Sequence, residues 1–530
     1  MGSMNWARAV LPACGLTIVL LTGADSALGQ SSDKAGNSLD DPQQANLAAV
    51  GQLLQQLQSE VRMLSSQVDS LKRQQESAQV ESAELHKELD AAKSQLLALG
   101  GKSVEDDPPQ TSAGNSGQQA AIEARIARLE DNQQLTDQKV AEQNQTKVES
   151  SSKYRLRLSG IVLFNMYENR GSVDNQDFPQ LAKAPSPLAS SGTFGGSLRQ
   201  SQVGLEGFGP TIGGARTSAV VQFDFAGGFP DAPNGVSFGL MRLRTGTVRF
   251  EWENTSIIAG QDTLFFSPLS ATSIATLAVP AFAYSGNLWS WTPQLRVEHR
   301  FMVSDNSSLL LQGGLLDPLA GETPPSQFYR YPGWGENSGQ PAYATRVAWT
   351  QSLQGQKIIA GIGGYYSRQD WGYGRTKDAW AGTADVTVPL GNRFEFTGQF
   401  FRGRGIGGLG GGIGQTALWN EDFTNPATEI YGLDSIGGWA QLKYKASAKL
   451  QFNGAFGMDN PFANELRQFG GNQTYFASPL SKNQSVMGNF LYQPKSDIVL
   501  SLEYRRLNTY TLDSAANRAN IITMSVGYIF

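Results

Sequence analysis

The residues of this chain that could support catalysis or metal binding are few. Among its 530 residues there are two histidines, His86 and His299, and one cysteine, Cys14. Neither histidine has an evident nucleophile as a partner, and two histidines so distant in the chain do not make a metal site. We therefore predict that the protein is not an enzyme and that it has no cofactor and no metal ion.

A glycine-rich stretch is the second candidate for chemistry. In GRGIGGLGGGIG, residues 403–414, Gly405, Gly407 and Gly410 have the GxGxxG spacing of a dinucleotide-binding turn. That spacing has meaning only between a strand and a helix of a βαβ unit, and the segment that follows here, QTALWNEDFTNP, lacks helical periodicity. We interpret the stretch as an irregular chain reversal at the end of a strand, where glycine supplies backbone freedom.

The N-terminal residues 1–29 have the layout of a secretory signal peptide. Arg8 precedes an apolar run over residues 9–22, and small residues follow it. The run is shorter than the roughly 20 residues that a membrane-spanning helix needs, and we expect no helical membrane span. Cys14 lies before most of the run, unlike the cysteine of a lipoprotein signal, so removal of the signal leaves a mature chain without cysteine.

Residues 45–99 are predicted to form a coiled coil in the periplasm. Apolar residues recur there at spacings of three and four over more than seven heptads, interrupted only at Gln75 and Ser82. A seam of this length needs partner helices to bury it, so we expect a homo-oligomer. A linker is predicted at residues 100–117 and a second, weaker helix at 118–150.

The net charge of the chain changes sign between the predicted helical region, which ends at residue 150, and the residues that follow. Residues 30–150 carry 11 Lys and Arg against 19 Asp and Glu, a net charge of −8, and the whole chain carries −5, so residues 151–530 carry +3. Neither value indicates a nucleic-acid-binding protein.

Residues 151–530 are predicted to form one β-barrel domain. The segment YRLRLSGIVLFNMY alternates apolar side chains with Arg155, Arg157 and Ser159, and similar segments of period two continue to the C-terminus. Sixteen such segments are expected, at residues 154–167, 198–209, 215–226, 239–252, 254–265, 293–303, 307–316, 342–352, 357–367, 376–389, 392–404, 434–446, 448–458, 483–493, 497–509 and 519–530.

The gaps between these segments alternate between short and long. This parity is typical of an outer-membrane barrel, with short turns in the periplasm and long loops outside. The last segment ends the chain on alternating apolar residues that include Tyr528 and Phe530, and we predict that it is the assembly signal read by the barrel-assembly machinery. The sequence thus predicts an all-β transmembrane barrel of about 16 antiparallel strands with an N-terminal α-helical coiled-coil extension.

The barrel's lumen is expected to be lined with charged residues. Sixteen strands enclose water rather than a packed core, and an Arg facing the bilayer midplane costs roughly 2 to 4 kcal/mol. If the apolar side of each strand faces lipid, a set of charged side chains points into the lumen. The basic ones are Arg216, Arg242, Arg244, Arg249, Arg296, Arg300, Arg346, Arg393 and Arg505, and the acidic ones are Asp224, Glu251, Glu298, Asp385, Glu395 and Glu503.

Two interpretations of these side chains stay open. In the first, they are solvated residues in which arginines pair with acids, and the paired acids include Glu251, Glu298 and Glu503. In the second, the arginines form a ladder that selects anions. The members of the ladder would be Arg216, Arg242, Arg244, Arg296, Arg300, Arg346 and Arg505. In the segment 239–252, Met241 and Leu243 are out of phase with Val248 unless a bulge lies near Gly246.

The segment at 267–291 is unusually apolar for a surface loop. It contains Leu277, Phe282, Trp289 and Trp291. We predict that it folds into the lumen and narrows it; the alternative is a contact with neighbouring subunits at the rim.

Several stretches of the chain resemble a known family. The segments KYRLRLSGIVLFNMY, SLRQSQVGLEG and RLRTGTVRFEWENTSIIAGQDTLFFSPL, with the coiled coil before them and the aromatic strand at the end, are similar to the DcaP-like porins. The resemblance implies a trimer of 16-stranded barrels with periplasmic coiled-coil extensions, which takes up small, often negatively charged organic acids. Phosphate-selective porins resemble this plan too, but they have lysine-rich lumens, whereas the inward cations here are arginines.

These observations predict an outer-membrane porin for passive uptake of small anionic solutes such as organic carboxylates and dicarboxylates. The alternatives are a phosphate-type anion porin, and a tether or adhesin that the barrel anchors and whose coiled coil contacts the cell wall. The expected partners are outer-membrane lipid, further copies of the chain in a trimer, and the solute; nucleic acid is not expected.

Overall fold

The computed structural model describes residues 155–185, 191–229, 239–322, 330–353, 355–419, 421–469 and 479–530. The predicted signal peptide, coiled coil, linker and second helix, residues 1–150, lie outside the described residues. Among the described residues, no helix is long and apolar enough to cross a membrane.

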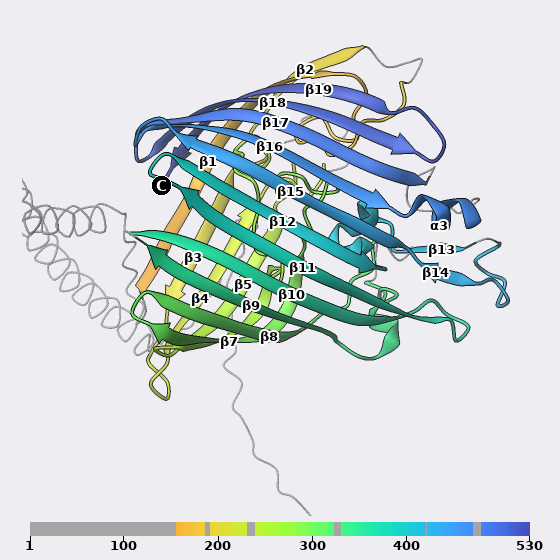
Figure 1. Ribbon diagram of the computed structural model, residues 1–530, viewed down its shortest axis with the longest axis horizontal. Helices are drawn as coiled ribbons and strands as arrows, with labels where there is room; N and C mark the ends of the chain where they lie inside the picture. Colours follow the sequence, from red (N-terminus) through yellow and green to blue (C-terminus); the bar gives the residue numbers. More distant parts are fainter. Residues whose placement is uncertain are drawn as a thin grey trace, which may run out of the picture. The chain divides into compact units, whose positions relative to one another are not determined.

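The described residues form a closed antiparallel β-barrel (Figure 1). From β3 to β19 each strand of the ring pairs with the next strand of the ring, and β1 pairs with β3 on one side and with the last strand, β19, on the other, which closes the ring. The strands are β1 (Arg155–Arg170), β2 (Gly192–Ser197), β3 (Gln202–Phe208), β4 (Arg216–Asp224), β5 (Arg242–Glu251), β6 (Thr255–Thr263), β7 (Trp291–Ser304), β8 (Ser307–Leu316), β9 (Ala342–Leu353), β10 (Gln356–Asp370), β11 (Thr376–Leu390), β12 (Phe394–Arg404), β15 (Asp434–Lys445), β16 (Leu450–Pro461), β17 (Leu480–Lys495), β18 (Ile498–Thr511) and β19 (Asn517–Ile529).

The barrel has sixteen strand positions because β2 and β3 share one of them. Both pair with β1, and residues 198–201 interrupt what is otherwise a single strand. All sixteen segments expected from the sequence overlap these strands, so the predicted barrel is confirmed. The one segment expected at 198–209 is split and begins earlier, at Gly192.

Alternation along the strands gives the barrel an apolar outside and a polar inside. In β18, Glu503 and Arg505 are buried, whereas the residues that alternate with them, Leu502 and Tyr504, are about half exposed. Successive side chains of a strand point to opposite faces, so the exposed apolar set forms the surface that a hydrocarbon phase would contact.

The two ends of the barrel differ as predicted. One end carries short turns, such as 252–254 and 305–306, and the other carries long loops, such as 264–290 and 405–433. The connections 371–375 and 512–516 at the long-loop end are shorter than expected because the strands beside them extend further.

The long loops hold small elements that the sequence did not predict. These are the 3-10 helices η1 (Glu336–Ser338), η2 (Gly407–Leu409) and η3 (Gly411–Gly414), the hairpin of β13 (Ala417–Trp419) and β14 (Ile430–Gly432), and α3 (Ala463–Gln468).

The C-terminal residues close the seam of the barrel. The Gly160 amide donates to the carbonyl of Phe530 at 2.8 Å, and the Phe530 amide donates back at 3.1 Å. Tyr528 lies on the outward face opposite Val162. The role of Tyr528 and Phe530 as an assembly signal stays a prediction.

Candidate functional site

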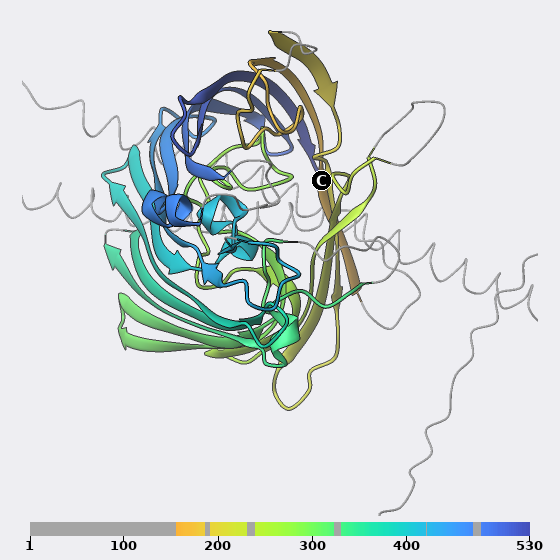
Figure 2. The same cartoon turned by 90° about the vertical axis from the view of Figure 1, so that its right-hand side faces the viewer.

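One long loop lies inside the barrel. It connects β6 to β7 and covers residues 264–290, and both views show it in yellow-green within the ring of strands (Figures 1 and 2). Arg244 of β5 donates to the carbonyl of Leu277 at 2.7 Å, and on the opposite side of the ring the Thr272 amide donates to Gln441 of β15 at 2.6 Å. The loop, which we call the inner loop, therefore crosses the lumen.

Apolar side chains attach the inner loop to the wall. Phe282 is almost fully buried, and its ring stacks on Trp439 of β15 at 6.4 Å, with Met487 of β17 in the same cluster. Leu288 and Phe266, near the two ends of the loop, belong to a second cluster that includes residues of β8 to β12. These contacts explain why a loop inside a water-filled barrel has an apolar sequence.

The predicted loop residues lie at different places. Leu277 contributes its carbonyl to the contact with β5, Phe282 forms the wall contact, and the Trp289 ring lies edge-on to Trp291 at 5.5 Å. Trp291 was expected in the loop but is the first residue of β7. The contribution of all four residues to a constriction stays a proposal.

The tip of the inner loop has a strained backbone. Phe282 and Tyr284 have positive φ angles of 64° and 56°, a region that costs non-glycine residues of order 1 to 3 kcal/mol each. Gly286 has a φ of 103°, and a Cβ there would collide with the carbonyl oxygens of Gly438 and Met458. The surrounding wall must hold this conformation, so the loop has one well-defined position.

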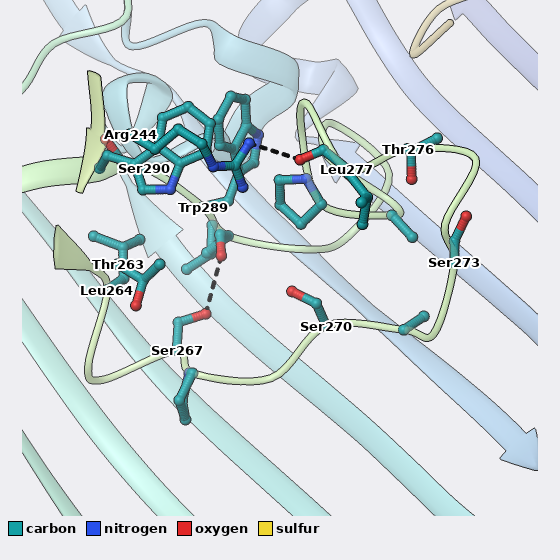
Figure 3. A pocket seen from close by; sticks show the side chains of 16 residues that line it. Arg244, Thr263, Leu264, Ser267, Ser270, Ser273, Thr276, Leu277, Trp289 and Ser290 are labelled. Atoms are coloured by element: carbon teal, nitrogen blue, oxygen red, sulfur yellow. Dashed lines mark hydrogen bonds between the residues drawn. The ribbon is translucent and has the colours of Figure 1, made fainter. Parts of the chain in front are cut away.

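A cavity of about 260 Å³ opens between the inner loop and β5 (Figure 3). Its lining combines six hydroxyl groups with one cation, Arg244, and the rings of Trp289 and Trp291. The hydroxyl groups belong to Thr263, Ser267, Ser270, Ser273, Thr276 and Ser290. Hydroxyl and guanidinium groups are donors for the oxygen atoms of an anion.

Arg244 shares its counter-ion with Arg242. Asp224 of β4 is fully buried and accepts from Arg242 at 2.6 Å and from Arg244 at 2.7 Å. Both guanidinium groups also lie over the Trp291 ring, at 4.8 and 4.5 Å from its centroid. Two cations with one carboxylate leave an excess positive charge beside the cavity.

The bulge expected in β5 is present. The pairing of β4 with β5 shifts register so that Gln222 lies opposite Thr245 and Phe223 opposite Leu243, which leaves Arg244 without a cross-strand partner. A bulge lets side chains on both sides of it keep the same face. Arg242 and Arg244 therefore point inward together with Arg249.

The other mid-strand arginines are paired with acids. Arg346 makes a two-point contact with Asp385 at 2.7 and 3.0 Å and is 6% exposed. This pair bridges β9 and β11 over Gly361 of β10, where a Cβ would lie 2.5 Å from the Asp385 carboxylate. Arg505 contacts Glu503 at 2.9 Å and is 3% exposed.

Arg296 is held in the same way. It contacts Asp262 at 2.9 Å and Glu298 at 2.7 Å and is 8% exposed. Of the two interpretations that the sequence left open, pairing with acids therefore describes Arg296, Arg346 and Arg505.

Two predicted arginines lie near the short-turn end. Arg300 donates to the Ser308 hydroxyl at 3.3 Å and has no ion pair with any described residue. Arg216 is 3.9 Å from Glu251 and largely exposed. The sequence placed all these side chains inside the barrel and predicted Glu298 and Glu503 among the paired acids, which contact Arg296 and Arg505 on the same strands. It did not indicate that Arg346 pairs with Asp385, or Arg296 also with Asp262, because these acids lie on other strands.

The glycine-rich stretch packs against the inner loop rather than forming a phosphate cradle. The Trp289 amide donates to the carbonyl of Leu409 at 2.9 Å. Backbone amides in and just after the stretch bind carboxylates of the protein: that of Ile413 donates to Asp459 at 3.0 Å, and that of Thr416, two residues after the stretch, donates to Glu322 at 2.9 Å. No pattern in the sequence indicated Asp459 or Glu322.

Glu465 of α3 lies at the long-loop rim and is 6% exposed. Its carboxylate accepts from the Asp434 amide at 2.9 Å and lies near the Tyr431 hydroxyl at 3.4 Å. The Asp434 carboxylate itself is held by Arg402 and Arg404 at 2.9 and 2.6 Å. Burial raises the pKa of Glu465 to about 7.

Raising the pH is expected to loosen α3. When the helix is detached, Glu465 ionises near its ordinary pKa of 4.5, whereas in the docked helix it stays protonated until about pH 7. The docked state therefore loses stability as the pH rises from 4.5 to about 7 and does not recover it above. Hydrogen exchange of residues 463–469, corrected for the intrinsic rate, should be faster at about pH 8 than at about pH 5, and Glu465→Gln should remove the difference. Equal protection at both pH values would contradict this.

Among the described residues, no group of three or more His, Cys, Asp and Glu is arranged to hold a metal ion. No family model and no curated protein matches the sequence.

Solved structures match the fold. The outer-membrane channel DcaP of Acinetobacter baumannii is 18% identical, with a TM-score of 0.56 over 72% of this chain and 99% of that one. An anion-selective porin from Comamonas acidovorans is 11% identical, with a TM-score of 0.46 over 71% of this chain and 100% of that one. The resemblance to the DcaP-like porins is thus confirmed at the level of the fold: this chain has the barrel fold of the outer-membrane channel DcaP.

Proposed function

We propose that the protein is an outer-membrane porin that admits small anionic solutes, such as organic carboxylates and dicarboxylates, by passive diffusion. The observation that carries this proposal is the inner loop, which crosses a closed barrel whose outside is apolar and whose inside is polar. A barrel of this size encloses a channel, and a loop across it reduces the free cross-section without closing the ring of strands.

The preference for anions is supported by the charges beside the inner loop. Arg242 and Arg244 share Asp224, so one positive charge is uncompensated where the cavity lies. A guanidinium group binds a carboxylate through two parallel hydrogen bonds, and fixed charges at a narrow point select the ions that pass.

The remaining parts of the proposal concern location and assembly. The apolar outward face supports a place in the outer membrane, with the short turns and the predicted coiled coil in the periplasm. The heptads of residues 45–99 support an oligomer, which we propose to be a trimer, and the terminal strand is proposed to be read by the barrel-assembly machinery.

Planar-bilayer recording on the purified full-length protein tests this function. We expect stepwise conductance increases, and a reversal potential in a KCl gradient that reports a preference for chloride. The succinate permeability should exceed that of a cation of similar size. A correctly folded protein that inserts but shows no conductance would refute the porin and favour a tether or adhesin.

A further inference from the structure

A recess of about 550 Å³ lies in the inner wall near the short-turn end of the barrel. Side chains and backbone of β1, β3, β4 and β5 line it. Its cations are Arg155, Arg216 and Arg249, and its acids are Glu206 and Glu251. We call it the lower recess.

The guanidinium groups of the lower recess are accessible. Arg216 is 3.9 Å from Glu251 with 81% of its side chain exposed, and Arg249 is 3.8 Å from Asp262 with 34% exposed. Both distances exceed that of a hydrogen bond to the acid, and Arg155 has no ion pair with any described residue. The Nε of Arg249 donates to the Thr247 hydroxyl at 3.4 Å, and the other N–H groups of these three arginines have no hydrogen-bond acceptor among the described residues, unlike those of the buried Arg346.

The recess also has an open floor and an apolar wall. Gly204 of β3 forms the floor, and a Cβ there would lie only 3.0 Å from the Ser159 hydroxyl. The Phe208 ring forms the wall, and the guanidinium of Arg155 lies 5.9 Å from its centroid. The lining therefore offers donors for carboxylate oxygens beside a surface for a short hydrocarbon chain.

The lower recess lies directly beyond the inner loop. Gln202, two residues before Gly204 on β3, donates to the carbonyl of Leu277 at 3.2 Å. From this contact β3 continues through Glu206 to Phe208, where the short turn begins. A solute that passes the inner loop on the β1 to β5 side reaches the recess before it leaves the barrel.

We propose that the lower recess is a second anion-binding site, which takes the carboxylate groups of a small dicarboxylate between the inner loop and the short-turn mouth. The proposal rests on the porin function argued above. Arg216 and Arg249 bind one carboxylate and Arg155 the other, while Phe208 contacts the carbon chain. Because the site lies on one side of the inner loop, solute binding is asymmetric across the channel.

Succinate is the probe that tests this site. In planar bilayers, succinate added to the short-turn side should increase current noise through the full-length channel more than succinate added to the other side. The triple variant Arg155→Ala, Arg216→Ala and Arg249→Ala should lose this response, and its chloride preference should fall by about threefold because three charges leave the lumen. Arg368→Ala is the matched control, since Arg368 is exposed and pairs with Asp378 outside the lumen.

Lysine variants distinguish direct binding of succinate at the lower recess from the effect of the positive charge of the lumen on all anions. Arg216→Lys with Arg249→Lys keeps the charge but loses two-point binding, so the chloride preference should persist while the succinate response weakens. An unchanged succinate response in the conducting alanine variant, or the same loss in Arg368→Ala, would overturn the second site and leave the porin intact. A full succinate response in the lysine variant would also overturn it. Absence of conductance in the unaltered protein would instead overturn the porin itself.

Discussion

Removing the inner loop is expected to raise the single-channel conductance by about twofold or more and to weaken ion selectivity, because the loop crosses the lumen and carries the contacts with Arg242 and Arg244. Residues 271–286 can be replaced by two glycines, since the side-chain Nδ2 of Asn287 donates to the Ser270 hydroxyl at 3.1 Å and the two limbs of the loop approach each other there. The retained ends, including Phe266 and Leu288, keep their buried contacts with the wall.

The pairing of neighbouring strands is independent of the deleted residues, so the barrel should still resist unfolding in detergent. A folded, conducting deletion variant with unchanged conductance would show that the inner loop does not limit the current.

A point substitution tests the same loop without deletion. Gly286→Val should displace the tip, because its side chain would collide with the Gly438 and Met458 carbonyls, and open-channel noise should increase. Gly339→Val is the control: Gly339 also has a positive φ, 72°, but nothing lies within 4 Å of its Cβ position. Equal noise in the two variants would mean that backbone strain alone is responsible.

Replacing Asp224 by asparagine is expected to raise the chloride-to-potassium permeability ratio by about threefold, because it removes the carboxylate that Arg242 and Arg244 share. Asparagine has the same shape as aspartate and keeps one acceptor oxygen. This oxygen can still accept from the Ala226 amide, which donates to the Asp224 carboxylate at 3.0 Å in the unaltered protein. The permeability ratio comes from the reversal potential in a KCl gradient.

Breaking a buried ion pair also costs stability, of order 3 to 5 kcal/mol, so the melting temperature should fall. Asp378→Asn provides the comparison, since Asp378 is half exposed on the outer surface. A lower melting temperature with an unchanged permeability ratio would mean that the two arginines hold the wall together and do not act on passing ions.

The fold could be predicted because each strand carries its own signal. Alternation such as that of Ser501, Leu502, Glu503 and Tyr504 specifies both a strand and the face that meets lipid. The bulge in β5 could be predicted for the same reason, since Leu243 and Val248 can face outward together only if the period breaks between them. The apolar composition of the inner loop indicated a loop that is not in water.

Partners on other strands could not be predicted in this way, unlike Glu298 and Glu503, which follow or precede Arg296 and Arg505 on the same strand. Arg346 reaches Asp385 only because β10 places Gly361 between them, and Asp224 serves two arginines only because of the bulge. The Ile413 amide of the glycine-rich stretch binds Asp459 and the Thr416 amide just after it binds Glu322, two acids that local patterns do not connect with this part of the chain.

The sequence by itself determined the sixteen strand positions, their order, the lipid-facing phase and the end of the barrel that carries the long loops, because these depend on neighbours along the chain. The tertiary structure alone decided which arginines are neutralised and which are accessible. That depends on distances between side chains of different strands: Arg346 of β9 and Asp385 of β11 form a closed ion pair at 2.7 Å, whereas Arg216 of β4 and Glu251 of β5 are 3.9 Å apart.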